Sequence, residues 1–199
     1  MSTVAPSLPR TALRAAFHVG VDGGGSGTRA CLQDAAGRAL GRGEAGPSGL
    51  SQGVEQAWRH VDAALAAAFA AAGIDRPPCG AIAIGLGLAG ANVERLRGAF
   101  LAADPGYAAC RLDNDAIAML VGAHAGGAGI VVAAGTGSVA VAQDALGGRR
   151  LIGGWGFPAG DEGSGAWLGL EAVRLAQAAV DGRAAASALA AAVLDACGG

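Results

Sequence analysis

Two sets of short predicted strands, each with a glycine-rich turn directly after a β-branched first strand, form the most regular pattern in the chain. In the first half, the apolar and polar positions predict strands at 17–21, 29–33 and 39–44. In the second half they predict strands at 130–132, 139–143 and 151–152. Each glycine turn lies between the first two strands of its set, so the pattern indicates two related α/β halves.

Helical periodicity accounts for most of the remaining chain. Apolar residues between Val54 and Phe69 recur every three or four positions, which predicts an amphipathic helix over 51–72 that Gly73 ends. The other expected elements are a strand at 81–88, a helix at 92–102, a strand at 108–112, and helices at 115–124, 164–180 and 184–196. We therefore expect a flexible leader over 1–15, a first domain over 16–118 and a partial second domain over 119–199.

The composition narrows the kinds of partner that the chain can have. The net charge is -2, and the sequence has no basic stripe that could neutralise nucleic-acid phosphates. Its apolar stretches are shorter than the roughly 20 residues of a membrane-spanning helix. Neither a nucleic acid nor a membrane is therefore an expected partner. The cysteines are widely spaced, so we expect them to be reduced and buried in a cytoplasmic protein: Cys31, Cys79, Cys110 and Cys197.

The two glycine turns have a composition that suits phosphate binding. They read Asp22-Gly-Gly-Gly-Ser-Gly-Thr28 and Gly135-Thr-Gly-Ser138. Glycine leaves the backbone N–H groups free of Cβ obstruction, so such turns can close around phosphate oxygens. Two of them predict a cleft that holds ATP from both sides, as in a phosphotransferase or an ATPase. The residues expected to bind the nucleotide are Asp22, Gly23, Gly24, Gly25, Ser26, Thr28, Gly135, Thr136, Gly137 and Ser138.

Asp22 is expected to have a second role. A carboxylate beside a triphosphate is repelled unless a divalent cation lies between them, so Asp22 is predicted to coordinate Mg2+. The alternative interpretation is that Asp22 only initiates the turn.

An acidic segment marks the candidate catalytic position. Asp113, Asn114 and Asp115 stand where a predicted strand runs into a predicted helix, at the carboxyl end of the sheet. Phosphoryl transfer to an alcohol needs a carboxylate that orients and deprotonates the hydroxyl, and Asp115 is the predicted base. In the alternative interpretation, Asn114 caps the helix and Asp115 interacts favourably with the helix dipole.

A glycine-rich segment over 153–165 combines two carboxylates with an indole. Asp161 and Glu162 can accept paired hydrogen bonds from vicinal sugar hydroxyls, and Trp155 can form a wall of the pocket. The segment is therefore predicted to bind a small-molecule sugar.

Four motifs together resemble a known family. They are Val19-Gly-Val-Asp-Gly-Gly-Gly-Ser26, Asn114-Asp-Ala116, Gly135-Thr-Gly-Ser138, and Gly154-Trp-Gly156 followed by Gly160-Asp-Glu-Gly-Ser164. The chain resembles the BadF/BadG/BcrA/BcrD-type ATPases and, within them, the N-acetylglucosamine and glucosamine kinases of the actin-like sugar-kinase superfamily. The resemblance implies an α/β fold of two ribonuclease-H-like domains, each of βββαβαβα type, around a cleft. The second domain is expected to be incomplete.

The resemblance also implies an activity and assigns roles to residues. Mg-ATP would donate its γ-phosphoryl group to the 6-hydroxyl of glucosamine or N-acetylglucosamine, with Asp115 as the base. The expected contacts with the amino sugar are Asn114, Thr136, Gly154, Trp155, Asp161 and Glu162. A homodimer is compatible with the resemblance.

Departures from the family pattern modify these expectations. Gly27 stands where a basic residue often follows the first turn, which removes one phosphate contact. Gly49 and Ala89 stand where polar residues are expected near the acetamido group, which favours glucosamine over its acetylated form. The family's adenosine-contacting turn and closing helix do not follow Gly199, so we expect this chain alone to bind ATP weakly.

Two other functions remain open. An ATPase activator of a 2-hydroxyacyl-CoA dehydratase would hold an iron–sulfur cluster, which needs convergent thiolates that the cysteine spacing does not provide. The other is a non-catalytic, truncated sugar-binding remnant of a kinase. The retention of Asp22, Asp115 and Asp161 disfavours that interpretation.

Overall fold

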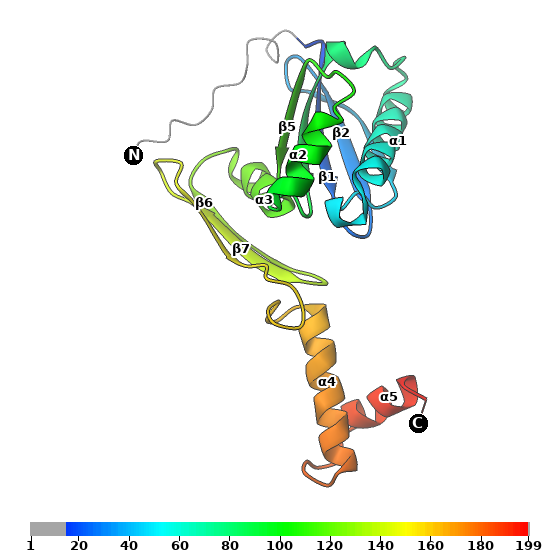
Figure 1. Ribbon diagram of the computed structural model, residues 1–199, viewed down its shortest axis with the longest axis vertical. Coiled ribbons are helices and arrows are strands. Elements are labelled where there is room, and N and C mark those ends of the chain that lie inside the picture. Colours follow the sequence, from blue (N-terminus) through cyan, green and yellow to red (C-terminus); the bar gives the residue numbers. More distant parts are fainter. Residues whose placement is uncertain (1–14, 199) are drawn as a thin grey trace. The chain divides into compact units, whose positions relative to one another are not determined.

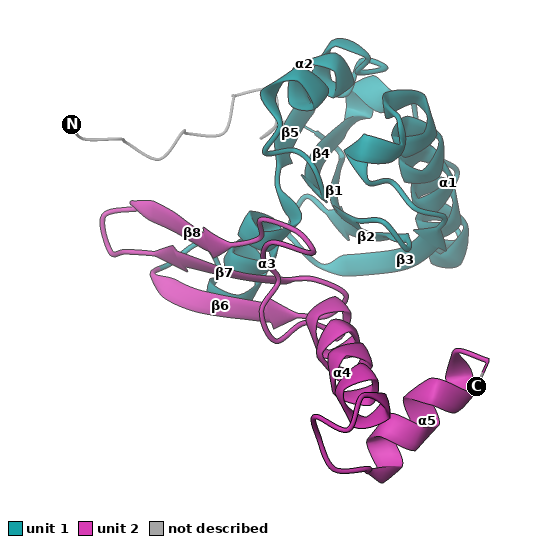
Figure 2. Ribbon diagram, turned by 60° about the horizontal axis from the view of Figure 1, so that its bottom comes forward, with its two compact units in different colours: residues 1–127 teal, residues 128–199 magenta. Residues whose placement is uncertain are grey.

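The computed structural model describes residues 15–198, which fall into two compact units (Figures 1 and 2). The first unit reaches Gly127 and the second begins at Ala128. The leader expected over 1–15 lies, apart from Ala15, outside the described residues. The domain ranges 16–118 and 119–199 stay a prediction.

The first unit is a mixed five-stranded sheet with three helices. Its first three strands form an antiparallel meander: β1 (Phe17–Gly23), β2 (Thr28–Asp34) and β3 (Ala39–Ala45). Two further strands run parallel to β1 in the order β3-β2-β1-β4-β5: β4 (Ile82–Leu88) and β5 (Ala109–Asp113). The helices are α1 (Val54–Ala72), α2 (Glu94–Ala102) and α3 (Asp115–His124). Helices and strands therefore follow the expected order βββαβαβα.

Glycines let α1 lie close to the meander (Figure 2). A Cβ at Gly43 would be 2.1 Å from the carbonyl oxygen of Ala64, and a Cβ at Gly41 would be 2.2 Å from that of Ala68. The apolar face of α1 is buried in the core of this unit through Val61, Leu65 and Phe69. The missing side chains on β3 therefore set the distance between helix and sheet.

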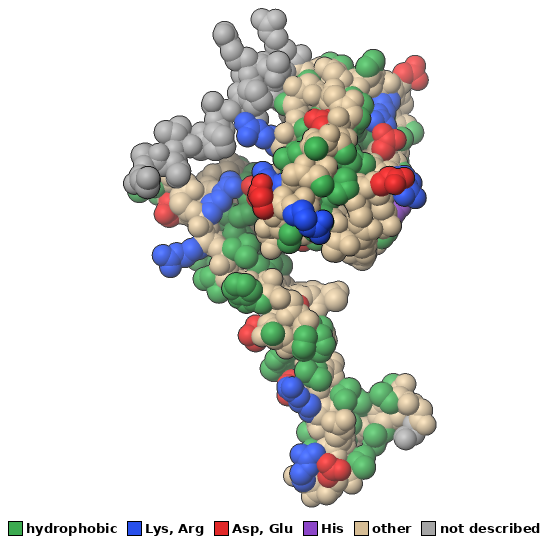
Figure 3. Space-filling view, in the orientation of Figure 1, with side chains coloured by type: hydrophobic (Ala, Val, Ile, Leu, Met, Phe, Trp, Pro, Cys, Tyr) green, Lys and Arg blue, Asp and Glu red, His purple; other side chains and the backbone are tan. Residues whose placement is uncertain are grey.

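The second unit repeats the meander and continues into two helices. Its antiparallel strands are β6 (Gly129–Ala134), β7 (Ser138–Gln143) and β8 (Arg149–Gly153), and its helices are α4 (Gly165–Val180) and α5 (Ala188–Ala196). Hydrophobic side chains gather on its surface (Figure 3). On one face of the sheet, Ile130, Val132 and Ile152 are 68%, 70% and 64% exposed.

Two helices begin later than the periodicity predicts. Helix α1 begins at Val54 rather than at 51, because the short 3-10 helix Leu50–Gln52 is followed by Gly53 at a φ of 116°, which interrupts the helix. Helix α5 begins at Ala188 rather than at 184, where the Ser187 hydroxyl accepts the N–H of Ala190 at 3.1 Å. In this alanine-rich sequence, caps and glycine conformation locate the helix starts, whereas propensity does not.

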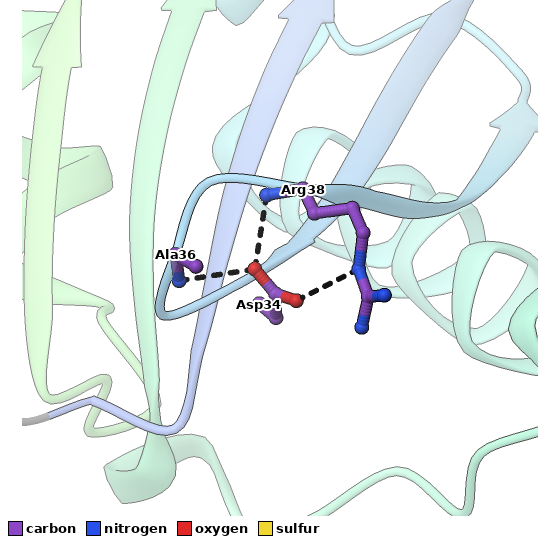
Figure 4. Close-up of polar contacts among 3 residues, drawn as sticks. All are labelled: Asp34, Ala36 and Arg38. Carbon is purple, nitrogen blue, oxygen red and sulfur yellow. Dashed lines mark hydrogen bonds and ion pairs between the residues drawn. The ribbon is translucent and has the colours of Figure 1, made fainter.

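The two meanders close with the same turn. In the β2–β3 turn, Asp34 Oδ1 accepts the N–H groups of Ala36 at 3.0 Å and Arg38 at 2.9 Å (Figure 4). In the β7–β8 turn, Asp144 Oδ1 accepts the two corresponding N–H groups, both at 2.8 Å. This matched geometry supports the repetition that the sequence pattern indicates.

The four cysteines are free, but the expectation that they are buried was wrong. Cys197 is exposed just after α5, and the other three are only partly buried. Desolvation raises the pKa of the Cys110 thiol to about 12, and the nearby Asp104 contributes to the same shift. Within the described part of the chain, the helices are too short or too polar for any of them to span a bilayer.

Candidate active site

A hollow at the carboxyl end of β1 brings the first glycine turn together with the predicted base. Its lining residues all belong to the first unit: Asp22, Gly23, Gly24, Ser26, Gly27, Thr28, Arg29, Glu44, Ala45 and Asp115. Asp22 comes from the end of β1, whereas Asp115 is the first residue of α3, directly after β5. Because β1, β4 and β5 are parallel, both carboxylates lie at the same edge of the sheet.

The first turn leaves three amide groups available for a ligand. The N–H of Gly24 donates to the carbonyl oxygen of Gly27 at 3.0 Å and closes the turn. The N–H groups of Gly25, Ser26 and Gly27 form no hydrogen bond with any described residue. Neighbouring backbone donors of this kind suit a phosphate oxygen.

The hydroxyl of Thr28 belongs to a buried network beneath the turn. Thr28 is 1% exposed, and its Oγ1 lies 2.6 Å from the carbonyl oxygen of Gly46 and 2.7 Å from Ser48 Oγ. A Cβ on Gly23 would lie 2.0 Å from the same Ser48 Oγ, so this position requires glycine. The Thr28 hydroxyl therefore supports the turn, and it could reach a phosphate only if this network opened.

Arg29 is a candidate site residue that sequence reasoning missed. Its Nη1 lies 3.6 Å from Asp22 Oδ2 and its Nε lies 3.9 Å from Glu44 Oε1, so the guanidinium stands between two carboxylates that line the hollow. The strand register pairs Asp22 with Arg29 and Arg29 with Glu44. The signal that could have found it was the hairpin itself, because a turn that brings Thr28 opposite Gly23 also brings Arg29 opposite Asp22.

At 114–115 the structure bears out the capping interpretation and also places a carboxylate in the hollow. Asn114 Oδ1 accepts the N–H of Ile117 at 2.9 Å, so Asn114 caps α3. Asp115 Oδ1 accepts the N–H of Ala116 at 2.9 Å, while the half-buried carboxylate lines the hollow. Asp115 Oδ2 receives no hydrogen bond from the described residues. The cap thus fixes the start of α3 and leaves one carboxylate oxygen available to a substrate.

The second glycine turn, in the second unit, also has available amides. The N–H of Gly135 donates to the carbonyl oxygen of Gly137 at 2.8 Å and closes the turn. The N–H groups of Thr136 and Gly137 form no hydrogen bond within the described part of the chain. This turn can therefore offer two adjacent donors to a phosphate.

The residues of the predicted sugar segment have very different surroundings. Asp161 is 8% exposed, and its Oδ1 accepts the N–H of Ser138, in the second turn, at 3.1 Å. Trp155 is 86% exposed, and Glu162 is exposed as well. Gly154 has a φ of 69°, a conformation that favours glycine. The structure therefore joins Asp161 to the second turn and leaves the indole and the Glu162 carboxylate open to solvent.

The surroundings of Asp22 suit a magnesium ion whose coordination is completed by water and substrate phosphates. Among the residues that the structure describes, no group of three or more His, Cys, Asp or Glu side chains is placed to hold a metal ion. Mg2+ usually keeps several waters and binds through one or two carboxylates plus substrate phosphates. A single exposed carboxylate beside a turn with available backbone amides meets that requirement.

The fold and the turn define the class of protein. A βββαβαβα unit with a glycine turn between its first two strands, and with carboxylates at the same sheet edge, is the arrangement expected for an actin-like α/β ATPase. The chain belongs to the BadF/BadG/BcrA/BcrD ATPase family, whose pattern matches residues 19–197. The family predicted from the motifs is therefore confirmed.

Two relatives carry the names of sugar kinases. The glucosamine kinase GspK of Vibrio cholerae is 35% identical over 167 residues, which are 83% of this chain and 56% of that protein. The N-acetylmuramic acid/N-acetylglucosamine kinase of Clostridium acetobutylicum is 30% identical over 169 residues, which are 84% of this chain and 55% of that protein. The chain thus spans about half the length of the curated relatives it matches.

Solved structures support the fold. A crystal structure from Chromobacterium violaceum, described as a "Putative N-acetylglucosamine Kinase", is 47% identical with a TM-score of 0.88 and covers 94% of this chain and 65% of its own. A structure from Porphyromonas gingivalis with the same description is 23% identical with a TM-score of 0.57, covers 89% of this chain and 61% of its own, and supports the fold alone. The expected α/β, actin-like fold class is confirmed.

Proposed function

We propose that the protein is an ATP-dependent amino-sugar kinase that transfers the γ-phosphoryl group of ATP to the 6-hydroxyl of glucosamine or N-acetylglucosamine. The observation that carries the proposal is the hollow in which the amide-lined first turn, Asp22 and Asp115 meet. The names of the two relatives and of the first solved structure support the same reaction.

The proposed mechanism assigns each part of the site a separate task. The available amides of the two turns bind phosphate oxygens, and Asp22 holds Mg2+, directly or through water. Asp115 orients the sugar hydroxyl and accepts its proton as the hydroxyl oxygen bonds to the γ-phosphorus. The bond from that phosphorus to the bridging oxygen breaks, and ADP leaves with its electrons.

The proposed sugar contacts are the side chains and glycines of the predicted segment. Trp155 and Glu162 are open to solvent, and Asp161 presents its Oδ2 without a hydrogen bond from the described residues. Asn114 offers its side-chain NH2 group to a ligand, while its Oδ1 caps α3. Thr136 and Gly154 complete the proposed set.

We propose glucosamine as the preferred substrate. The N–H of Gly49 donates to Gly24 O at 3.0 Å and that of Ala89 donates to Gly23 O at 2.9 Å, so both residues lie beside the first turn. Neither has a polar side chain that could bind an acetamido group. The ratio of kcat/KM for glucosamine to that for N-acetylglucosamine tests this preference, and comparable values would contradict it.

The decisive experiment on the function is ADP release with glucosamine, compared between wild type and Asp115→Asn. The asparagine keeps the oxygen that accepts the Ala116 N–H but cannot accept the substrate proton, so the rate should fall about 100-fold or more. Asp104→Asn makes the same change before β5, where Oδ1 accepts the N–H groups of Gly106 and Tyr107, and should leave the rate unchanged. A rate in Asp115→Asn close to wild type would exclude Asp115 as the base.

Three further parts of the proposal concern the metal ion, the cellular location and the oligomeric state. Magnesium dependence of ADP release would support the role given to Asp22. A cytoplasmic location is in keeping with four free, widely spaced cysteines. A homodimer stays a prediction, which sedimentation of the purified protein can test.

A further inference from the structure

Four hydrogen bonds join the second glycine turn to residues 161–166, which end the segment before α4 and begin that helix. Two run from Ser138, whose N–H donates to Asp161 Oδ1 at 3.1 Å and whose hydroxyl donates to the carbonyl oxygen of Glu162 at 2.8 Å. Two run back from the first turn of α4: Gly165 N–H to Gly135 O at 2.8 Å, and Ala166 N–H to Thr136 O at 3.3 Å. The turn and this segment are therefore held together as one structural element.

Asp161 occupies an unfavourable state within this element. Its φ of 67° lies in the left-handed region, which costs free energy in a residue other than glycine. Its carboxylate is nearly buried yet receives one hydrogen bond, from Ser138, among the residues described. No fully buried side-chain oxygen or nitrogen among the described residues lacks a hydrogen-bond partner, so Oδ2 reaches solvent and is accessible to a ligand hydroxyl.

The position of this carboxylate depends on the residue at 137. A Cβ on Gly137 would lie 2.8 Å from Asp161 Oδ2 and 3.2 Å from Oδ1. Any side chain there would push the carboxylate away from the Ser138 N–H. Gly137 also has an available amide, so the same residue serves the phosphate side of the turn and makes room for Asp161.

We propose that Asp161 is a positioning residue that sets the conformation of the 135–138 turn and links it to sugar binding, which rests on the proposed function. One carboxylate oxygen holds the turn through Ser138, and the other accepts a sugar hydroxyl. A sugar hydroxyl that donates to Oδ2 gives the carboxylate a second hydrogen bond and fixes the position of the carboxylate. The turn amides are then held in place for phosphate, so binding of each substrate favours binding of the other.

Hydrogen exchange of the ligand-free protein tests the positioning role without any substrate. In Asp161→Ala the Ser138 N–H loses its acceptor, so its exchange should become about tenfold faster or more. Asp161→Asn keeps an oxygen acceptor and should show a smaller change. Glu162→Gln is the matched control, because the exposed Glu162 holds the turn only through its main-chain carbonyl. In this variant the Ser138 N–H should exchange at the wild-type rate.

A second variant, Gly137→Ala, tests the same role if Asp161→Ala does not fold. If circular dichroism finds Asp161→Ala unfolded, Gly137→Ala displaces the carboxylate without removing it and should accelerate exchange of the same amide. Unchanged exchange at Ser138 in a folded Asp161→Ala, or in Gly137→Ala, would overturn the positioning role.

The coupling between sugar binding and nucleotide binding is tested by a separate measurement. Calorimetry with Mg2+ and a non-hydrolysable ATP analogue should give a Kd for the nucleotide at least threefold lower with saturating glucosamine than without it in wild type, and no difference in Asp161→Ala. Equal Kd values with and without glucosamine in wild type would overturn the coupling between nucleotide binding and sugar binding. The exchange result is independent of catalysis, so a positioning role can hold even where Asp115→Asn contradicts the kinase function, and the two failures are distinguishable.

Discussion

Gly43 on β3 faces the carbonyl oxygen of Ala64 on α1 so closely that a Cβ at Gly43 would lie 2.1 Å from that oxygen. The helix backbone therefore rests directly on the strand. Because α1 covers the meander that contains the first glycine turn, this contact contributes to the position of the turn as well as to stability.

Gly43→Ala should destabilise the protein. The added methyl group has no free volume, so α1 must move away from β3 at a cost of about 1–3 kcal/mol. Thermal or urea unfolding measures the change. Gly20→Ala on β1 is the matched control, because a Cβ there would meet nothing within 4 Å, and its midpoint should stay close to that of wild type. An equal loss in both variants would contradict the packing argument.

Arg29→Gln should weaken phosphate binding. Arg29 is 75% exposed and Asp22 62% exposed, so their ion pair at 3.6 Å contributes little stability and the guanidinium can turn to a phosphate. Loss of that contact should raise the Kd for Mg-ATP about fivefold or more, with a smaller effect at high salt.

Calorimetry at two ionic strengths tests this expectation. Arg38→Gln is the control, since Arg38 is similarly exposed at 78% but pairs with Asp34 in the β2–β3 turn, away from the residues that line the hollow. Equal affinity in wild type and Arg29→Gln would mean that Arg29 only neutralises Asp22.

The Asp34 turn should add a pH dependence to stability. The backbone N–H of Arg38, with further help from Ala36 and the Arg38 guanidinium, lowers the pKa of Asp34 below its usual value against a smaller effect of desolvation (Figure 4). A folded-state pKa below the unfolded one stabilises the protein above the unfolded value of about 3.9. That contribution is lost as the pH falls through the folded pKa.

Asp34→Asn should therefore lower Tm near neutral pH and differ less from wild type as the pH approaches the folded pKa. Thermal unfolding over this range measures the difference. Asp75→Asn, in the exposed loop after α1, should not change Tm. A Tm difference between wild type and Asp34→Asn that stays constant as the pH falls would contradict the role given to the ionised Asp34 carboxylate.

The order of the elements was predictable because their signals are local. Alternation of apolar residues marked the two meanders, and glycine with hydroxyl residues marked the two turns. The Asn114 cap was likewise visible, because an N-cap depends on residues within one turn of helix. The start of α1 was misplaced, since the positive φ of Gly53 is not specified by the apolar repeat.

The chain alone determined which segments become strands and helices and where the two glycine-rich turns lie, because these properties depend on neighbouring residues. Only the tertiary structure decided what each polar side chain does there. Strand register put Arg29 beside Asp22, burial committed the Thr28 hydroxyl to Gly46 and Ser48, and the packing of a distant segment brought Asp161 to Ser138. Such contacts join residues far apart in sequence, and their partners are fixed only when the backbone has folded.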